Sequence, residues 1–301
     1  MTPDQLLLTL GDVLVGHRNA DGGWGYYPGK RSRVEPTCWA ALALGAMPDG
    51  GETLNRACGL LRTWQRTDGL IAEPGLTPDI TFNGLALVAL ETNQRQGNSS
   101  EDAVAARLAQ ALCSVKVLQT ANDSIQRQNN QLRGWPWSEG AFSWVEPTAW
   151  CVLALKKWRR SHASRPRTLD ARIAEADAML LDRACRGGGW NYGNSNMLGR
   201  ELHPYVPTTA EALLALQDRR QEAPVAAGLE FLVKNATRET SGMALSLAQL
   251  ALSVYRVRIP GMAESLAAAW EHSRFLDNLS VTGMAAFALA ADKQGADAIA
   301  I

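Results

Sequence analysis

A short apolar segment that ends on an Ala-Leu pair occurs six times along the 301 residues. Its clearest copies are PTCWAALAL from Pro36, PTAWCVLAL from Pro147 and TTAEALLAL from Thr208, and the last copy, VTGMAAFALA, begins at Val281. These segments are apolar on nearly every face, which is typical of buried helices. The repeat therefore predicts six buried helices built on one pattern. The pairs that end them are Ala43-Leu44, Ala89-Leu90, Ala154-Leu155, Ala215-Leu216, Ala251-Leu252 and Ala288-Leu289.

Amphipathic helices are expected between the buried ones, at roughly 3–16, 52–66, 101–119, 168–185, 222–235 and 260–275. Alternating apolar and amphipathic helices predict two concentric layers, and no useful length of sequence alternates like a β-strand. We expect one all-α domain over residues 1–301, an (α/α)6 toroid of six helix hairpins in two rings. Its repeats end near residues 44, 90, 155, 216, 252 and 289.

Charge and cysteine content exclude several classes of partner. Lys plus Arg and Asp plus Glu both number 30, so no net field favours nucleic acid. The five cysteines form no CxxC pair, which argues against a disulfide framework and fits a reducing, cytoplasmic location. No run of eighteen apolar residues exists, so we expect no transmembrane segment, although peripheral membrane contact stays open.

The loops that precede the buried helices are glycine-rich and aromatic in the first, third and fourth repeats. They read DGGWGYYPGK from Asp21, RGWPWSEGAFSW from Arg133 and GGGWNYGNSNMLG from Gly187. In the last two repeats the corresponding loops shrink to a few residues, around 240–242 and 278–280. Long loops should therefore cover only part of one rim.

These loops and helices resemble the repeat family of prenyltransferases and squalene-hopene cyclases, in which a Gln-Asp-Gly-Trp loop precedes each inner helix. Asp21-Gly22-x-Trp24 matches that loop, Gln65-x-x-Asp68-Gly69 matches it without the tryptophan, and Gly188-x-Trp190 keeps less. The resemblance implies an α/α toroid of single-toroid size. It also implies isoprenoid cyclisation or prenyl transfer, and each activity has motifs that can be compared with this chain.

In class II cyclases a DxDD motif opens an inner helix, and its middle aspartate protonates the isoprenoid. That aspartate aligns with Glu35 and Glu146, while Pro36 and Pro147 replace the following one. Only one of three carboxylates remains, so the standard DxDD acid is missing. A weak general acid, or a hydrogen-bond donor to a polar head group, is the expected role of a desolvated carboxyl group here.

In prenyltransferase β-subunits, zinc is held by an Asp, a Cys and a distant His. The matching run is Pro36-Thr37-Cys38, which lacks the aspartate, and none of the four histidines opens an inner helix. A lone cysteine does not hold zinc. Because these zinc ligands are missing, we expect neither a metal site nor a cofactor for this chain.

Candidate site residues follow from the expected position of helix N-termini at one mouth. The candidate catalytic residues are Glu35, Glu146 and Asp79, and the candidate ligand-binding residues are Trp39, Trp150, Phe82, Trp144 and Tyr205. Each has a structural alternative, since acids cap helix N-termini and tryptophans pack between repeats.

Three functions stay open, and whether the chain is an enzyme is one of the open questions. The first is a terpene-cyclase-like or isoprenoid-binding toroid; if it is an enzyme, it is a cyclase-like isomerase or lyase, or prenyltransferase-like. The second is a catalytically silent scaffold that binds a protein partner. The third is a carbohydrate-active α/α barrel, since sugar sites also use acids and tryptophans.

Metal analysis tests the motif argument. Protein purified without a histidine tag should contain less than about 0.1 equivalent of zinc or magnesium, because one thiolate alone gives weak binding. Stoichiometric zinc that disappears in Cys38→Ser would contradict this expectation.

Overall fold

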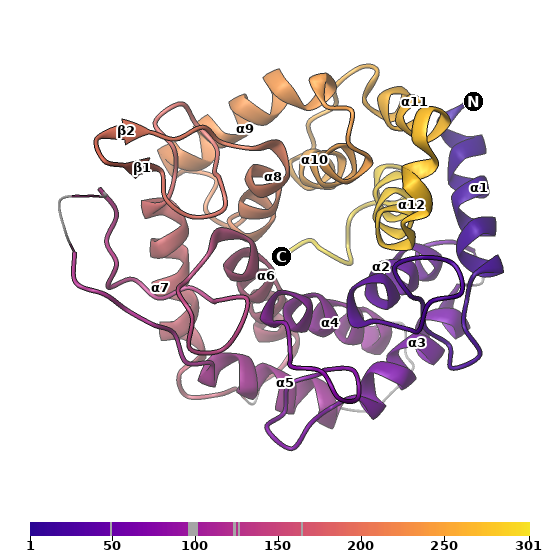
Figure 1. The fold of residues 1–301 in the computed structure, drawn as a ribbon, viewed down its shortest axis with the longest axis horizontal. Coiled ribbons are helices and arrows are strands. Elements are labelled where there is room, and N and C mark those ends of the chain that lie inside the picture. Colours follow the sequence, from indigo (N-terminus) through magenta and orange to yellow (C-terminus); the bar gives the residue numbers. More distant parts are fainter. Residues whose placement is uncertain (49, 96–101, 123–124, 126, 164) are drawn as a thin grey trace.

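Helices of the two predicted classes alternate along the chain and form two concentric rings (Figure 1). The computed structural model describes residues 1–48, 50–95, 102–122, 125, 127–163 and 165–301. The inner helices are α2 (Val34–Gly45), α4 (Ile80–Asn93), α6 (Val145–Ser161), α8 (Val206–Ala215), α10 (Gly242–Tyr255) and α12 (Leu279–Gln294). The outer helices are α1 (Pro3–Gly16), α3 (Gly51–Thr63), α5 (Ala103–Ser114), α7 (Leu169–Asp182), α9 (Ala223–Asn235) and α11 (Met262–Ser273). The predicted all-α double ring is confirmed.

The inner helices contact one another in a closed ring. Contacts run from α2 through α4, α6, α8 and α10 to α12, and α12 in turn contacts α2. A helix with neighbours on both sides and an outer helix behind it has no face left for water. In α4 even the polar Asn83 and Glu91 are buried. This closure explains why the inner segments lack a polar stripe.

Two glycines allow adjacent inner helices to approach closely. A Cβ atom on Gly84 of α4 would lie 2.7 Å from the Trp150 carbonyl carbon of α6. A Cβ atom on Gly283 of α12 would lie 2.8 Å from the Ala40 nitrogen of α2. Both contacts are with backbone atoms, which cannot swing aside as a side chain can. These glycines therefore set the spacing of the two closest inner pairs.

Three loop tryptophans join an outer helix to the following inner helix by the same pair of hydrogen bonds. The indole Nε1 donates to a carbonyl near the end of the preceding outer helix, and the backbone N–H donates to a threonine Oγ1 of the next inner helix. The indole bonds are Trp24–Leu14 (2.7 Å), Trp135–Leu112 (2.9 Å) and Trp190–Leu180 (2.6 Å). The backbone bonds are Trp24–Thr37 (3.0 Å), Trp135–Thr148 (2.8 Å) and Trp190–Thr209 (2.9 Å). In the second repeat, Ile71 N instead donates to Asn83 Oδ1 at 2.7 Å.

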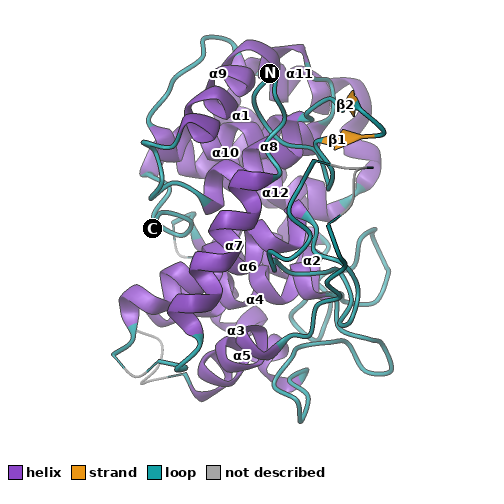
Figure 2. Cartoon of the chain, turned by 90° about the vertical axis from the view of Figure 1, so that its left-hand side faces the viewer, coloured by secondary structure: helices purple, strands orange, loops and turns teal. Residues whose placement is uncertain are grey.

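Each long loop also caps the inner helix of the preceding repeat. The first backbone N–H groups of α12, α4 and α6 donate to the carbonyls of Tyr26, Trp137 and Tyr192, at 2.8, 2.9 and 2.8 Å. Val34 N, at the start of α2, donates to Glu73 Oε1 at 2.8 Å. The loops thereby satisfy helix-end donors that burial would otherwise leave unpaired. Figure 2 shows these loops gathered on one side of the ring.

The C-terminal residues lie inside the ring (Figure 1), at the end opposite to the long loops (Figure 2). The Lys157 Nζ atom of α6 donates to the carbonyls of Asp297 and Ala300, both at 3.0 Å, and Gln217 Nε2 donates to Ile299 O at 2.9 Å. Burial lowers the pKa of Lys157 to about 7. Two carbonyl acceptors rather than an acid therefore hold this amine.

Departures from the expected elements are local. Helix α5 ends at Ser114 rather than near 119, and Leu118 beyond it pairs with Phe142 as an isolated bridge; residue 101 lies outside the described residues. The described sheet is one hairpin, β1 (Asn196–Met197) with β2 (Arg200–Glu201). Short 3-10 turns follow α9 and α11, η2 (Ala236–Arg238) and η3 (Arg274–Asp277). None of the described helices is long and apolar enough to cross a membrane.

The close contact at Gly84 predicts opposite effects for two glycine substitutions. Gly84→Ala should destabilise the protein by about 1–3 kcal/mol because its Cβ meets the α6 backbone. Gly59→Ala, in α3 with nothing within 4 Å of the new Cβ, should stabilise it by up to about 1 kcal/mol through helix propensity. Urea unfolding of both variants checks this, and a harmless Gly84→Ala would disprove the packing argument.

Candidate functional site

Glu35 and Glu146 occupy the same place in two inner helices, at the second residue of α2 and of α6. Four residues further on lie Trp39 and Trp150, one turn deeper along the same face of each helix. The repeat thus places two carboxyl groups at one level and two indoles beneath them. Ser280 holds the equivalent position at the start of α12.

The Glu35 carboxyl group is bound by hydroxyl groups rather than by a cation. Ser280 Oγ donates to Glu35 Oε1 at 2.8 Å, and the Tyr26 hydroxyl donates to the same carboxyl group. Burial raises the pKa of Glu35, and these two hydrogen bonds partly offset it. Arg33 is turned to a different acid, since its Nε lies 2.7 Å from Glu73 Oε1.

The Glu146 carboxyl group lies beneath an indole of its own loop. Trp137 Nε1 donates to Glu146 Oε2 at 3.1 Å. Burial raises the pKa of Glu146 to about 7, the Trp137 bond opposes that rise, and the charges of Asp79 and Glu35 add to it. A substantial fraction of Glu146 therefore keeps its proton at neutral pH.

Asp79 has a structural role, and its charge also raises the pKa of Glu146. It is the N-cap of α4, where its Oδ1 accepts from Thr81 N at 2.9 Å. Burial raises its pKa as well. Together with Phe82 and Arg33, Asp79 lines a pocket of about 250 Å³ beside the mouth. Asp79 is thus a helix cap, as the structural alternative expected. Its charge also contributes to the raised pKa of Glu146.

Glu211 of α8 is a fourth acid, which the sequence analysis did not single out. In the aligned copies it takes the place of Trp39 and Trp150, and the segment TTAEALLAL already displays it. The side chain is buried, and Trp150 Nε1 donates to its Oε1 at 3.2 Å. Burial raises its pKa well above the usual value, and the Glu146 charge adds to this. A single acid at an otherwise apolar repeat position was the available signal.

Together, Glu35, Asp79, Glu146 and Glu211 form a group that we call the carboxyl cluster. None of the four makes an ion pair with any residue that the structure describes, while the Arg33–Glu73 pair lies at the edge. Carboxyl groups that share a desolvated space without a cation hold protons more tightly. Such perturbed groups are typical of functional sites, although structural networks perturb pKa values too.

Aromatic rings fill the axis beneath Glu35 and Glu146, at the level of Glu211. The Trp39 and Trp150 ring centroids lie 5.2 Å apart, edge to face, although α4 separates α2 from α6 in the ring. The Phe287 ring of α12 lies 6.3 Å from Trp39. All three side chains are buried, so bulky groups close the axis at this depth. A ligand must therefore bind above Trp39 and Trp150 or displace them.

A second set of rings lies at the rim and is more open to solvent. Trp137 stacks on Trp144 with centroids 4.7 Å apart, and Tyr192 lies 6.5 Å from Trp137 and 5.9 Å from Tyr205. Tyr192 is 38% exposed and Tyr205 is 52% exposed. These four residues form what we call the rim aromatics. Two predicted ligand residues, Trp144 and Tyr205, belong to them, whereas Phe82 lies in the separate pocket with Asp79.

Metal ligands are not assembled among the described residues, where no group of three or more His, Cys, Asp and Glu side chains is arranged to hold an ion. Cys38 is fully buried, and burial raises the pKa of its thiol well above the usual value. A buried thiol of that kind is a poor nucleophile. The polar groups described at the mouth are carboxyl, hydroxyl and indole groups.

Comparison with known proteins shows the fold alone. The chain matches no protein-family model and no curated protein. A variant of the type II terpene cyclase MstE from Scytonema, in complex with geranylgeranyl dihydroxybenzoate, superposes with a TM-score of 0.62 at 14% identity over 96% of this chain and 97% of that one. Cellobiose 2-epimerase from Bacillus thermoamylovorans superposes with a TM-score of 0.59 at 9% identity, over 90% of this chain and 87% of that one. An α-amylase from Clostridium perfringens gives 0.64 at 9% identity over 93% and 96%. The α/α toroid is therefore shared by terpene cyclases and carbohydrate-active enzymes.

The pKa of Glu146 predicts a pH-dependent stability difference. Glu146 binds its proton more tightly in the folded state, with a pKa near 7 against 4.5 for the ordinary group, so its favourable contribution is full below about pH 4.5 and is lost as pH rises through 7. Glu146→Gln keeps the acceptor for Trp137 but does not ionise. Its stability relative to wild type should therefore rise by about 2–3 kcal/mol between pH 4.5 and 8. Urea unfolding at both pH values measures the change, and the exposed Glu230→Gln in α9 serves as the control that should show none.

Proposed function

We propose that the mouth of the toroid binds a long apolar ligand of isoprenoid type and that the carboxyl cluster hydrogen-bonds or protonates an oxygen atom of that ligand. The observation that carries the proposal is a cluster of carboxyl groups without an ion-pair partner among the described residues, next to the rings of the axis and of the rim. Apolar walls with a few polar groups inside are typical of small-molecule sites.

Glu146 is the acid best suited to proton transfer. A general acid works best when its pKa lies near the working pH, and burial raises the pKa of Glu146 to about 7. An acid of this strength suits an epoxide or carbonyl oxygen rather than an isolated alkene. Positive charge that develops on a neighbouring carbon would lie near the π faces of the rim aromatics, which stabilise cations.

The terpene cyclase comparison supports the class of ligand. MstE has the same ring fold and is seen with geranylgeranyl dihydroxybenzoate, a molecule with a long isoprenoid chain and a polar end. The mouth of the present chain offers the matching chemistry, with carboxyl groups for a polar end and rings for an apolar chain. We therefore extend the ligand class from MstE to this chain because the chemical groups of the mouth match it, and not because of the 14% sequence identity.

A carbohydrate ligand is the second candidate, and the exposed rim favours it. Tyr192 and Tyr205 present half-open rings, on which sugar faces can stack. Paired acids are the machinery of glycoside hydrolysis, and two of the structural neighbours are named for sugar chemistry. A sugar would use the rim and leave the buried indoles of the axis unused.

Two double variants test the isoprenoid proposal. In Glu35→Gln/Glu146→Gln the amides still donate hydrogen bonds but cannot give up a proton as a carboxylic acid does. Binding of geranylgeraniol should stay within about threefold of wild type, and conversion of its terminal epoxide should fall at least about 100-fold. In Glu35→Met/Glu146→Met the donors are gone, so geranylgeraniol binding should weaken about tenfold or more.

The control is Glu230→Met on the outer ring, which should change neither binding nor conversion. Thermal melts accompany every variant, because a helix-cap role would lower stability in both double variants. Unchanged geranylgeraniol binding in the Met variant would refute the proposal. Tight binding of maltotetraose or cellotetraose, with none of geranylgeraniol, would replace it by the carbohydrate candidate, and binding of neither would leave the protein-scaffold alternative.

A further inference from the structure

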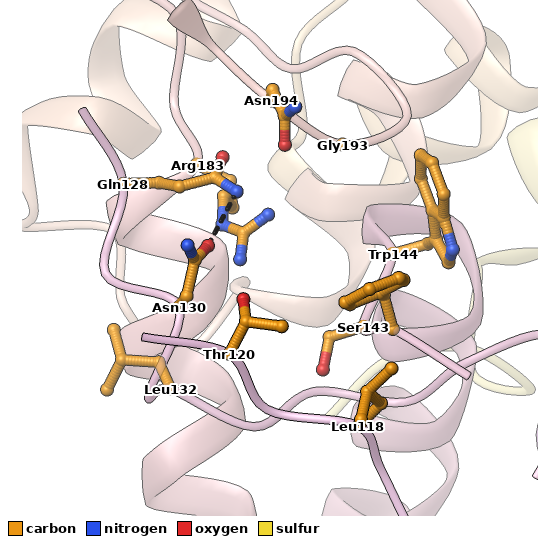
Figure 3. Close-up of a pocket in the computed structure, with 11 residues that line it drawn as sticks. Leu118, Thr120, Gln128, Asn130, Leu132, Ser143, Trp144, Arg183, Gly193 and Asn194 are labelled. Carbon is orange, nitrogen blue, oxygen red and sulfur yellow. Dashed lines mark hydrogen bonds between the residues drawn. The ribbon is translucent and has the colours of Figure 1, made fainter. Parts of the chain in front are cut away.

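A second hollow lies outside the mouth, between the loops of the third and fourth repeats. It has a volume of about 350 Å³. Its polar lining comes from Thr120, Gln128, Asn130, Ser143, Asn194 and Arg183, with Trp144 and two leucines as apolar walls (Figure 3). We call it the Arg183 pocket, because Arg183, the C-cap residue of α7, has the one charged side chain among the described residues that line it.

The Arg183 side chain is buried without the partners that a buried charge needs. Its side chain is 6% exposed, and its Nε atom has no hydrogen-bond acceptor. The nearest acid, Asp182, lies 3.7 Å from Nε, beyond hydrogen-bonding distance. Figure 3 shows the guanidinium group pointing into the hollow beside Gln128 and Asn130. A charge desolvated in this way is costly unless an anion completes its bonds.

Arg172, about three turns earlier in α7, shows what a structural arginine looks like in this protein. It is also buried, but its guanidinium group donates to the carbonyls of Arg133 and Gly134 and lies over the Trp135 ring, 3.8 Å from the centroid. Every feature that stabilises Arg172 is missing around Arg183. The contrast shows that the described residues leave hydrogen-bonding capacity of the Arg183 guanidinium group unused.

The described residues around Arg183 are mostly neutral, and several are hydrogen-bonded to one another. Gln128 Nε2 donates to Asn130 Oδ1 at 3.0 Å, and Gly134 N donates to Ser143 Oγ at 2.9 Å. Asp182 Oδ2 already accepts from Asn129 N at 2.9 Å. Among the described residues, an incoming anion therefore meets a guanidinium group whose Nε has no hydrogen-bond acceptor, and one nearby carboxylate, which already accepts a hydrogen bond.

We infer that the Arg183 pocket binds an oxyanion, the carboxylate or phosphate group of a small ligand, through the guanidinium group of Arg183. A planar guanidinium fork suits two oxygen atoms of either group. Trp144 connects the two sites, because it lines this pocket and stacks on Trp137, the donor to Glu146. The inference does not depend on the proposed function of the mouth.

Isothermal titration with three probes tests the inference: inorganic phosphate, benzoate and benzamide. Benzamide has the shape of benzoate without its charge. Wild type should bind phosphate, benzoate or both saturably, and benzamide at least tenfold more weakly than benzoate. The anion that binds distinguishes a phosphate ligand from a carboxylate ligand. Glu35→Gln/Glu146→Gln should bind the anions as wild type does, which separates this site from the mouth.

Three arginine variants complete the test. Arg183→Met should lose anion binding by at least tenfold while its melting temperature holds or rises, because a buried charge whose Nε has no hydrogen-bond acceptor is removed. Arg183→Lys keeps the charge but not the planar guanidinium fork, so its affinity for the anion should be intermediate. If Arg183→Met does not fold, the anion affinity of Arg183→Lys tests the inference instead. Arg186→Gln, at a 71% exposed side chain nearby, makes the same change in net charge and should bind like wild type.

Several outcomes would overturn the inference. One is wild type that binds neither anion. Another is an Arg183→Met variant that binds the anion with wild-type affinity. If Arg183→Met does not fold, a folded Arg183→Lys variant with wild-type affinity for the anion has the same meaning. A third, where benzoate binds saturably, is benzamide binding as tight as that of benzoate.

Discussion

The structure depends on how the inner helices obtain hydrogen-bond acceptors at their N-termini. These ends converge at a mouth where burial keeps water from the first N–H groups, so the chain itself must supply acceptors. It does so across repeats: the loop of one repeat caps the inner helix of the repeat before it, through the carbonyls of Tyr26, Trp137 and Tyr192 and the carboxylate of Glu73. The same loops are tied to their own repeats by Trp24, Trp135 and Trp190. The loops of the rim are therefore hydrogen-bonded both to their own repeats and to the inner helices α12, α2, α4 and α6. The carboxyl cluster lies inside this rim.

Much of this fold was predictable because the repeat encodes it. The apolar copies fixed the number and order of inner helices, and the spacing of Glu35 and Glu146 before their tryptophans placed both acids at one level. The end of α5 was not predictable in the same way. Residues 115–119 continue a helical pattern, but Leu118 pairs with Phe142 of a distant loop, and tertiary pairing of this kind overrides local preference.

The site was predictable only in part, for a related reason. A repeat shows which residues share a position, so Glu211 was visible as an acid at a tryptophan position. It does not show which side chains meet across the axis, and the Trp39–Trp150 contact joins helices that are not neighbours in the ring. Arg183 had no sequence signal at all, because what distinguishes it is the lack of partners once the chain has folded. Residues that break a local rule, as Glu211 and Arg183 do, are typical of functional or strained sites in proteins.

The cap that the first loop provides belongs to the last inner helix, and this has a consequence for how the chain comes to be folded. Ser280 and Glu35, which also meet at this seam, lie 245 residues apart in sequence. During synthesis from the N-terminus, α2 must wait for α12 before its exposed flank is covered and before Tyr26 finds its partner. Contacts of such long sequence separation form slowly. Until then the partial ring is an open arc with apolar edges at both ends, the kind of intermediate that associates with other chains or requires a chaperone.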